Sequence, residues 1–290
     1  MVKLGTLREP NGFEANNSSS SPSSVVGGKV KFGCGSYESG LILSQKADGI
    51  LGMSKSKFSL INQLASSNKI SNTFSICSSQ KAGILTIGDA SLPRELCKGG
   101  LIRVPYAHNR RIRRKHLYAI ALKSMHVGDT LFTKQKRAVI LDTGSTMSYL
   151  PESMHSAFVS LLEKMIPAGA GRVGRGSNVC YAPLAPQGGG RSSPFEDFPA
   201  LTLSFGTQMD ITLPPHAYLF PQVAPYKGQR TKMYCPLFQR QGKGANEIHL
   251  GSVMLENFLL VFEDRHVSLA PCDCSSLASN QTVRAMISQL

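Results

Sequence analysis

One carboxylate in this chain stands where a side chain could do acid-base chemistry. Residues 139–151 read Val-Ile-Leu-Asp-Thr-Gly-Ser-Thr-Met-Ser-Tyr-Leu-Pro, so Asp142 follows three apolar β-formers and precedes a glycine turn. Two carboxyl groups held about 3 Å apart cannot both ionise, so they share one proton and supply an acid and a base in one site. The pattern predicts that Asp142 is one half of such a pair.

Rigid elements must position this carboxylate. Apolar stretches bounded by Gly, Pro and Ser predict short strands, and apolar residues at steps of three and four predict a helix from Pro151 until Pro167 stops the pattern. A weaker helix is expected around Phe58, Ile61 and Leu64, with both apolar stripes in the core. Glycine-rich stretches at 168–176 and 188–190 read as surface loops. The chain is therefore expected to be mainly β, with strands at 30–32, 84–87, 118–122, 139–141, 201–205 and 258–262.

Composition narrows the class of protein. With 290 residues and 41% apolar content, the chain can bury a large core, and two lobes are expected. No apolar run approaches the roughly 20 residues that cross a bilayer, and residues 1–10 lack the apolar region of a secretory signal. The net charge of +14 and the basic block at 110–115 could indicate a nucleic-acid partner. Because no nucleic-acid-binding motif accompanies them, a solvated loop is the better interpretation.

The cysteines favour disulfides over a metal. Their spacing offers no second pair of Cys or His at ligand distance, and Cys272-Asp273-Cys274 is too tight for a zinc-ligand pair. An odd count in an oxidising compartment leaves one thiol unpaired or a partner elsewhere. Reduced, buried cysteines in a cytosolic protein remain the alternative. The seven positions are 34, 77, 97, 180, 235, 272 and 274.

The order of strand, Asp142 loop and helix resembles the second active-site loop of the pepsin-like aspartic proteases, most like the plant and protist branch. In that family a later strand ending in two apolar residues and a glycine threads the loop, and His249-Leu250-Gly251 is similar to it. Further landmarks span residues 30–274: Phe32-Gly33-Cys34-Gly35, Asp48 to Met53, Phe74 to Cys77, Ile84 to Gly88, Val261 to Asp264 and Leu269 to Cys272.

The resemblance implies a two-lobed pepsin-like acid protease fold with an incomplete amino-terminal lobe. Residues 1–107 are expected to be the remnant of that lobe, with a low-complexity loop at 11–28. Residues 108–275 are expected to form the carboxy-terminal lobe, and 276–290 a tail. Because the family's lobes are repeats, the 109 residues between Asp142 and Gly251 (251 − 142 = 109) predict that the Asp answering to Gly52 would fall before Met1. A flap tyrosine is missing too, since Tyr37 lacks the flap context.

The resemblance also implies roles for individual residues. Asp142 is the catalytic carboxylate; the supporting loop residues are Thr143, which braces the two loops, Gly144, which allows close backbone approach, Ser145, which donates to Asp142, and Thr146, which meets substrate backbone. Tyr149 packs against the substrate groove, and Leu250 and Gly251 belong to the threading strand. His249 is interpreted as a strand residue. No metal or organic cofactor is expected, because the dyad activates water by itself.

The family then implies an aspartic-type endopeptidase that acts on polypeptides as a monomer in the secretory pathway, outside the cell or in a vacuole-like compartment. This chain is expected to be inactive alone. A non-catalytic protein that binds peptides or inhibitors is the alternative, and a dimer pairing two copies of Asp142 is a third. Cys180 with Cys235 is expected to bridge within the carboxy-terminal lobe, and Cys77 with Cys272 or Cys274 to tie the lobes.

Overall fold

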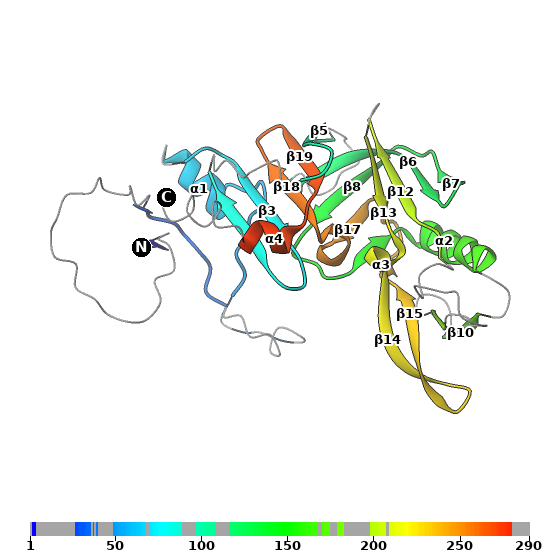
Figure 1. Cartoon of the computed structure of the whole chain (residues 1–290). Coiled ribbons are helices and arrows are strands. Elements are labelled where there is room, and N and C mark those ends of the chain that lie inside the picture. The colour runs from blue at the N-terminus through cyan, green and yellow to red at the C-terminus, as the bar shows by residue number, and fades with distance from the viewer. Residues whose placement is uncertain are drawn as a thin grey trace. The chain divides into compact units, whose positions relative to one another are not determined.

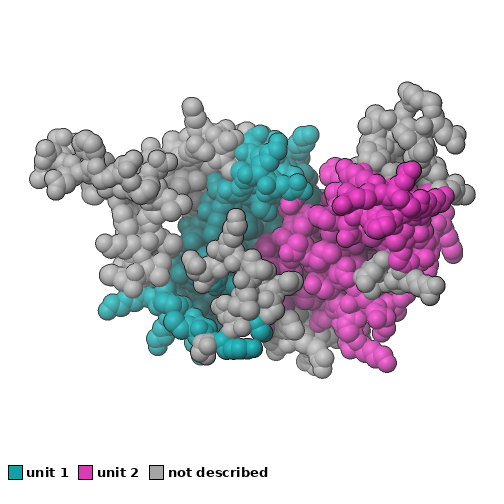
Figure 2. All heavy atoms as spheres, turned by 90° about the horizontal axis from the view of Figure 1, so that it is seen from below, with its two compact units in different colours: residues 1–103, 257–290 teal, residues 104–256 magenta. Residues whose placement is uncertain are grey.

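The chain forms two compact units in the computed structural model. Unit 1 holds residues 1–103 and 257–290, and unit 2 holds residues 104–256. Figure 1 traces the elements, and Figure 2 colours the two units. The structure describes residues 2–3, 27–35, 37, 39, 49–67, 70–88, 97–107, 116–166, 170–174, 179–182, 198–206 and 209–279.

Unit 1 is built on a five-stranded sheet of order β4-β3-β18-β19-β5, whose last strand runs past the unit boundary at residue 103. Strands β3 and β18 pair antiparallel although they lie far apart in sequence, and Phe74 stacks on Phe262 across them at 4.6 Å. The elements are β1 (Val2–Lys3), β2 (Gly27–Gly28), α1 (Leu60–Ser66), β3 (Phe74–Ser78), β4 (Gly83–Ile87), β5 (Ile102–Pro105), β18 (Phe258–Phe262), β19 (His266–Pro271) and α4 (Cys274–Ser279).

Two disulfides lie inside the core of unit 1. They join Cys77 to Cys274 and Cys97 to Cys272, and these cysteines pack with Leu259 among the buried residues. The pairing of Cys77 with Cys274 is one of the two expected from the sequence. Both cysteines belong to compact unit 1, because β18, β19 and α4 return the chain to it. The expectation that this bond ties one lobe to the other stays a prediction, because it depends on the lobe boundaries.

Unit 2 is built on a sheet of order β13-β12-β6-β8-β17-β9-β16, with β7 paired to β6. A second sheet has the order β10-β11-β15-β14 and contains a long hairpin from β14 and β15, with the Cys180–Cys235 disulfide expected from the sequence. The elements are β6 (Ala119–Val127), β7 (Thr130–Thr133), β8 (Arg137–Asp142), β9 (Ser148–Leu150), α2 (Glu152–Met165), β10 (Gly171–Val173), β11 (Cys180–Ala182), β12 (Leu201–Phe205), β13 (Met209–Leu213), α3 (Pro215–Tyr218), β14 (Leu219–Tyr226), β15 (Gln229–Pro236), β16 (Phe238–Arg240), β17 (Ile248–Gly251) and the 3₁₀-helix η3 (Ser252–Leu255).

Helix α2 supports the part of the unit 2 sheet that carries the Asp142 loop. Its buried face includes Phe158, whose ring meets those of Tyr218 and Phe238 edge-on at 6.3 and 5.2 Å. Buried His155 of the same helix contacts the Phe238 carbonyl through Nε2 at 3.0 Å. The helix is thereby fixed to β16, which pairs with β9.

Most of the helices and strands expected from the sequence are present in the structure. The strands expected at 84–87, 118–122, 139–141, 201–205 and 258–262 and both helices are present. The strand expected at 30–32 is absent from the described residues, and Phe58 is 68% exposed although it was expected in a core. The stretch expected to be a loop at 168–176 contains strand β10, which is paired with β11.

Some expectations lie outside the described residues, among them the basic block at 110–115, the glycines at 188–190 and most of the 11–28 loop, of which 27–28 form β2. The compact units also divide the chain differently from the expected lobes. Residues 257–275 belong to unit 1, because β18 and β19 complete the sheet of β3 and β4. The lobe boundaries at 107 and 275 stay a prediction.

Candidate functional site

Asp142 lies at the end of β8, a strand that is buried along Ala138–Leu141 because β6 and β17 flank it. The chain turns immediately after it: the Ser145 amide donates to the Asp142 carbonyl at 3.2 Å. The Ser145 hydroxyl also donates to Asp142 Oδ2 at 2.9 Å. The loop thus fixes the carboxylate while leaving 31% of its side chain exposed.

Strand β17 threads this loop. It lies between β8 and β9, the two strands that the loop joins, and it pairs parallel with β8 so that Gly251 stands opposite Asp142. A Cβ on Gly251 would overlap the Met147 carbonyl group and come within 2.8 Å of the Ser145 oxygen. Since backbone atoms cannot yield to a side chain, only glycine fits at this crossing.

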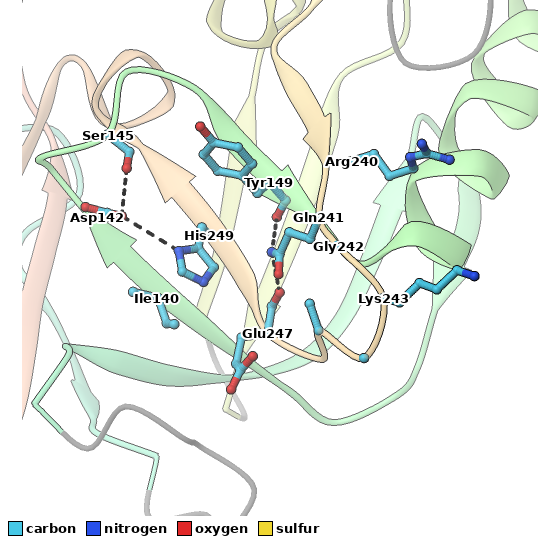
Figure 3. Close-up of a pocket in the computed structure, with 12 residues that line it drawn as sticks. Ile140, Asp142, Ser145, Tyr149, Arg240, Gln241, Gly242, Lys243, Glu247 and His249 are labelled. Atoms are coloured by element: carbon cyan, nitrogen blue, oxygen red, sulfur yellow. Dashed lines mark hydrogen bonds and ion pairs between the residues drawn. The ribbon is translucent and has the colours of Figure 1, made fainter. Parts of the chain in front are cut away.

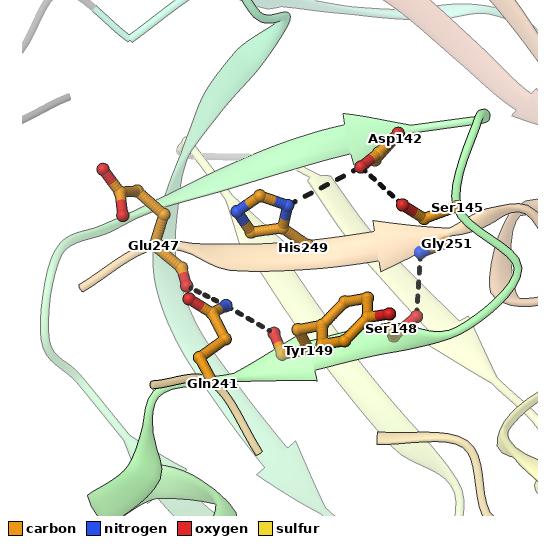
Figure 4. Close-up of polar contacts among 8 residues, drawn as sticks. All are labelled: Asp142, Ser145, Ser148, Tyr149, Gln241, Glu247, His249 and Gly251. Atoms are coloured by element: carbon orange, nitrogen blue, oxygen red, sulfur yellow. Dashed lines mark hydrogen bonds and ion pairs between the residues drawn. The ribbon is translucent and has the colours of Figure 1, made fainter. Parts of the chain in front are cut away.

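Two hydrogen bonds hold the Asp142 loop against β17 and the residue that follows it, and Figure 4 draws the one between Gly251 and Ser148. The Gly251 amide donates to the hydroxyl of Ser148 at 2.9 Å, and the Ser252 amide donates to the Ser145 carbonyl at 2.7 Å. Ser148 is 1% exposed, so its hydroxyl satisfies a backbone donor that water does not reach. The loop conformation therefore depends on β17.

His249, on the same strand, is an ionisable neighbour of Asp142. Its Nδ1 lies 3.7 Å from Asp142 Oδ2, which is too long for a hydrogen bond but close enough for an ion pair when the imidazole is protonated. The imidazole also meets the Tyr149 ring edge-on at 6.3 Å. The carboxylate thus has a basic partner inside its own unit.

These neighbours favour the charged form of Asp142. The His249 imidazole lowers the pKa of the carboxyl group most, partial burial raises it, and the Ser145 hydroxyl and the Gly144 amide lower it further. The net direction is downward from the ordinary value. The carboxylate is therefore ionised over a wider acid range than a free aspartate.

A cavity of about 590 Å³ opens in front of Asp142. Figure 3 shows Asp142, Ser145 and His249 turned toward one another, with Arg240 and Lys243 on the side away from Asp142. Arg240 forms an ion pair with Glu152 at 3.0 Å. The wall is lined by Ile140, Asp142, Ser145, Tyr149, Arg240, Gln241, Gly242, Lys243, Gly244, Ala245, Glu247 and His249.

The residues predicted from the sequence lie together, with differences in detail. Thr143 and Thr146 are exposed, and the Thr143 hydroxyl has no hydrogen bond to any described residue. A Cβ at Gly144 would lie 3.5 Å from Asp142 Oδ1, an ordinary contact, so crowding at the carboxylate is not what requires glycine there. Leu250 is buried in β17, and Tyr149 lines the cavity.

Sequence reasoning missed three residues of the site. It assigned His249 to a strand only, although a histidine in place of an apolar residue before Gly251 was itself a signal. It gave no role to Ser148 or to Gln241, whose side-chain amide donates to the carbonyls of Tyr149 and Glu247 at 3.3 and 2.8 Å. No sequence pattern marks those two.

Metal-binding and membrane-spanning features are both missing from the residues that the structure describes. Within that part of the chain, no three His, Cys, Asp or Glu side chains gather as a metal site would require. No helix in the same part has the length and apolarity to cross a membrane.

Comparisons with known proteins bear on this geometry. The family model described as "Xylanase inhibitor N-terminal" matches residues 11–89, and the one described as "Xylanase inhibitor C-terminal" matches residues 117–269, more than half of the chain. The chain belongs to the pepsin-like aspartic protease family. Curated proteins of Arabidopsis thaliana are among those similar to this pepsin-like chain.

Two relatives and two solved structures illustrate the likeness of this pepsin-like chain. Aspartic proteinase 36 of Arabidopsis thaliana is 29% identical over 268 residues, which cover 86% of this chain and 50% of that protein. Aspartic proteinase-like protein 1 of the same plant is 22% identical, covering 90% and 46%. Soybean basic 7S globulin superposes with a TM-score of 0.63 at 19% identity, covering 80% of this chain and 59% of the other. Lupine conglutin gamma, also a basic 7S globulin, gives 0.60 at 20%, covering 78% and 58%.

The comparisons establish the mainly β, two-lobed pepsin-like fold. The chain spans about half the length of the curated relatives that it matches. Any activity of those full-length proteins can therefore be assigned to this chain only as a proposal.

Proposed function

We propose that this chain supplies one catalytic carboxylate, Asp142, of an aspartic-type endopeptidase. In such an enzyme two carboxyl groups sharing a proton polarise a water for attack on a peptide carbonyl and return a proton to the leaving amine. The observation that carries the proposal is the geometry of the loop. Asp142 is a half-buried carboxylate facing a cavity of about 590 Å³, held by Ser145 and by a threading strand.

The other loop residues receive roles in this proposal. Ser145 keeps the carboxylate in its charged form, and exposed Thr146 is free to contact the backbone of a polypeptide substrate. Exposed Thr143 is free to brace a second loop of the same kind. Tyr149 forms a wall of the substrate groove. No metal or organic cofactor takes part.

The second carboxylate must come from outside these 290 residues. The sequence contains a single Asp-Thr-Gly and no Asp-Ser-Gly, so nothing else in it answers to Asp142. Asp48 is followed by Gly49-Ile50, so its sequence does not match such a loop. The isolated chain is therefore expected to be catalytically inactive as a monomer.

A non-catalytic role in binding polypeptides is the second candidate. Two findings favour it: the matched family models carry the description of xylanase inhibitors, and the superposed structures are basic 7S globulins. A cavity with one carboxylate could then hold a peptide segment without cleaving it. In either role the partner is a polypeptide.

The disulfides and the family support an oxidising compartment. The structure contains three disulfides, and one exposed cysteine, Cys34, is free. Disulfides persist in oxidising compartments, which supports the secretory pathway, the cell exterior or a vacuole as the site of action.

The deciding experiment compares two proteins. Purified residues 1–290 are expected to release no fragments from a peptide library between pH 3 and 7. A longer product that adds an apolar-Asp-Thr/Ser-Gly segment is expected to cleave peptides in acid and to be blocked by pepstatin.

Asp142→Asn in that longer product tests the assignment of the carboxylate. Its activity is expected to fall below detection, whereas Asp129→Asn, at the exposed turn between β6 and β7, is expected to retain it. Hydrolysis by monomeric residues 1–290 would contradict the half-site. Absence of cleavage by the longer product, with peptide binding retained, would instead establish the binding role.

A further inference from the structure

His249 occupies a position where the fold brings it to Asp142 rather than to the strand's exterior. In the parallel pairing of β17 with β8, His249 stands opposite Ile140 and Gly251 opposite Asp142. Side chains two residues apart on a strand share a face, so His249 lies diagonally beside the carboxylate. The close-ups in Figures 3 and 4 show its Nδ1 directed at Asp142.

The packing restricts the imidazole. Its side chain is only 17% exposed, and the Tyr149 ring lies edge-on to it with an interplanar angle of 83°. Burying an apolar side chain at this position would cost less free energy than burying an imidazole. The imidazole loses hydration on burial, and only a polar or charged partner offsets that loss. Asp142 is that partner, 3.7 Å away.

We propose that His249 is a positioning residue for Asp142, and that the His249 imidazole keeps the Asp142 carboxylate ionised and turned into the cavity. The consequence for catalysis rests on the function proposed above. In a dyad that shares one proton, a cation beside one carboxylate makes that carboxylate the ionised member. The shared proton would then reside on the second carboxyl group, and Asp142 would accept the proton of the attacking water.

Other ionisable groups around the pair act more weakly. Those that line the same cavity are Tyr149 on β9, Arg240 on β16, Lys243 in the following loop and Glu247 just before β17. Arg240 is already paired with Glu152. The His249 imidazole, 3.7 Å from the carboxylate, is also the first cause of the lowered pKa of Asp142.

The pH dependence has a definite sign. Because the pKa of Asp142 is lowered in the folded chain, its ionised form stabilises the fold fully above the unfolded value of about 3.9. This stabilisation disappears as the pH falls through the folded value. Removing the imidazole is expected to raise the pKa of Asp142 in the folded chain. The pH range over which the ionised carboxylate stabilises the fold then becomes narrower.

Carboxyl NMR tests the proposal without any need for catalysis. Residues 1–290 labelled with ¹³C at aspartate carboxyl groups are titrated from pH 2 to 8, and Asp142→Asn identifies the signal. His249→Asn is expected to raise the midpoint of Asp142 by about one pH unit, a tenfold change in proton affinity. His126→Asn, on β6 and outside the cavity lining, is expected to leave it unchanged.

His249→Ile provides a second variant, because it restores the apolar-apolar-Gly pattern and is expected to fold even if the asparagine variant does not. An Asp142 midpoint that stays at the wild-type value in a folded His249 variant would overturn the proposal. The two proposals fail separately. A raised midpoint in a longer product that never cleaves peptides would remove the protease function but keep this pair, whereas active enzyme with an unmoved midpoint would do the reverse.

Discussion

Each unit contains a segment of two residues followed by a glycine, His249-Leu250-Gly251 in unit 2 and Ile50-Leu51-Gly52 in unit 1. The first segment is packed between strands, whereas the second is exposed. In unit 2, His249-Leu250-Gly251 runs between two strands, Leu250 is 2% exposed, and the loop of Asp142 passes directly over Gly251. In unit 1, Ile50 and Leu51 are 82% and 55% exposed, and a Cβ on Gly52 would meet no described atom within 4 Å. The pattern alone therefore does not create the crossing.

The difference separates what a sequence motif specifies from what its partner supplies. The glycine at 251 is required because another backbone segment occupies the space of its side chain. At position 52 the same residue type has no such neighbour among the described residues. Substitutions at matched positions of the two units test this contrast.

Gly251→Ala is expected to destabilise unit 2 by about 3 kcal/mol or more, because its Cβ would collide with the backbone of the Asp142 loop. The backbone at Gly251 has φ −80°, so the effect is steric rather than conformational. Gly52→Ala is the matched control and is expected to change stability by less than about 0.5 kcal/mol. Urea denaturation measures both, and similar midpoints for the two variants would refute the contrast.

Loss of a disulfide is expected to matter more in unit 1 than in unit 2. Cys77 and Cys274 are fully buried and 197 residues apart, so replacing both with serine is expected to cost about 3–5 kcal/mol. Replacing Cys180 and Cys235, 55 residues apart and partly exposed, is expected to cost about 2–3 kcal/mol. Thermal melting of the two double variants ranks them. Equal losses would show that loop length and burial do not control the difference.

Ser148→Ala tests the link between the loop and β17. It removes the acceptor of the Gly251 amide in a buried site, so a loss of about 1–3 kcal/mol is expected. Ser145→Ala, whose hydroxyl lies at the partly exposed carboxylate, is the control and is expected to cost under about 1 kcal/mol. If Ser145→Ala lowers the stability more than Ser148→Ala in denaturant titrations, then the contact with the carboxylate holds the loop in place, and the bond to β17 does not.

Leu51→Ser is expected to have the smallest effect on stability, within about 0.5 kcal/mol, because the side chain is already 55% exposed. It is expected instead to lower the fluorescence of a hydrophobic dye, since Ile50, Leu51 and Phe58 leave apolar surface open in unit 1. Leu250→Ser, at the corresponding position of unit 2, is expected to unfold that unit. Dye binding that is unchanged in Leu51→Ser would mean that another surface takes up the dye.

Much of this fold was predictable because local signals and tertiary partners agree. Helix α2 has an apolar stripe that packs against Phe238 and Tyr218, and the apolar run before Asp142 becomes a central strand. The order of landmarks along the chain was enough to indicate the family. The helix and the strand depend on apolar residues that recur at short intervals, and the family on motifs that can be read one after another along the chain.

Other features depend on partners far away in the sequence and could not be predicted. Val30 and Phe32 have strand propensity, but propensity forms a strand only where a neighbouring strand pairs with it. Cys77 and Cys274 lie in the same compact unit only because β18 pairs with β3, a strand far away in the sequence. The same reason hid the contact of His249 with Asp142, which follows only from the register of β17 on β8.

The threading of β17 also has a consequence for the time course of folding. The bond between Gly251 and Ser148 joins residues 103 positions apart, so during synthesis the Asp142 loop is made long before the strand that passes through it. Contacts of such sequence separation close slowly, because a long chain segment must first be ordered. A ribosome-bound chain that ends before residue 248 would carry the Asp142 sequence without the Asp142 site. The geometry around Asp142 is therefore among the last features of this chain to form.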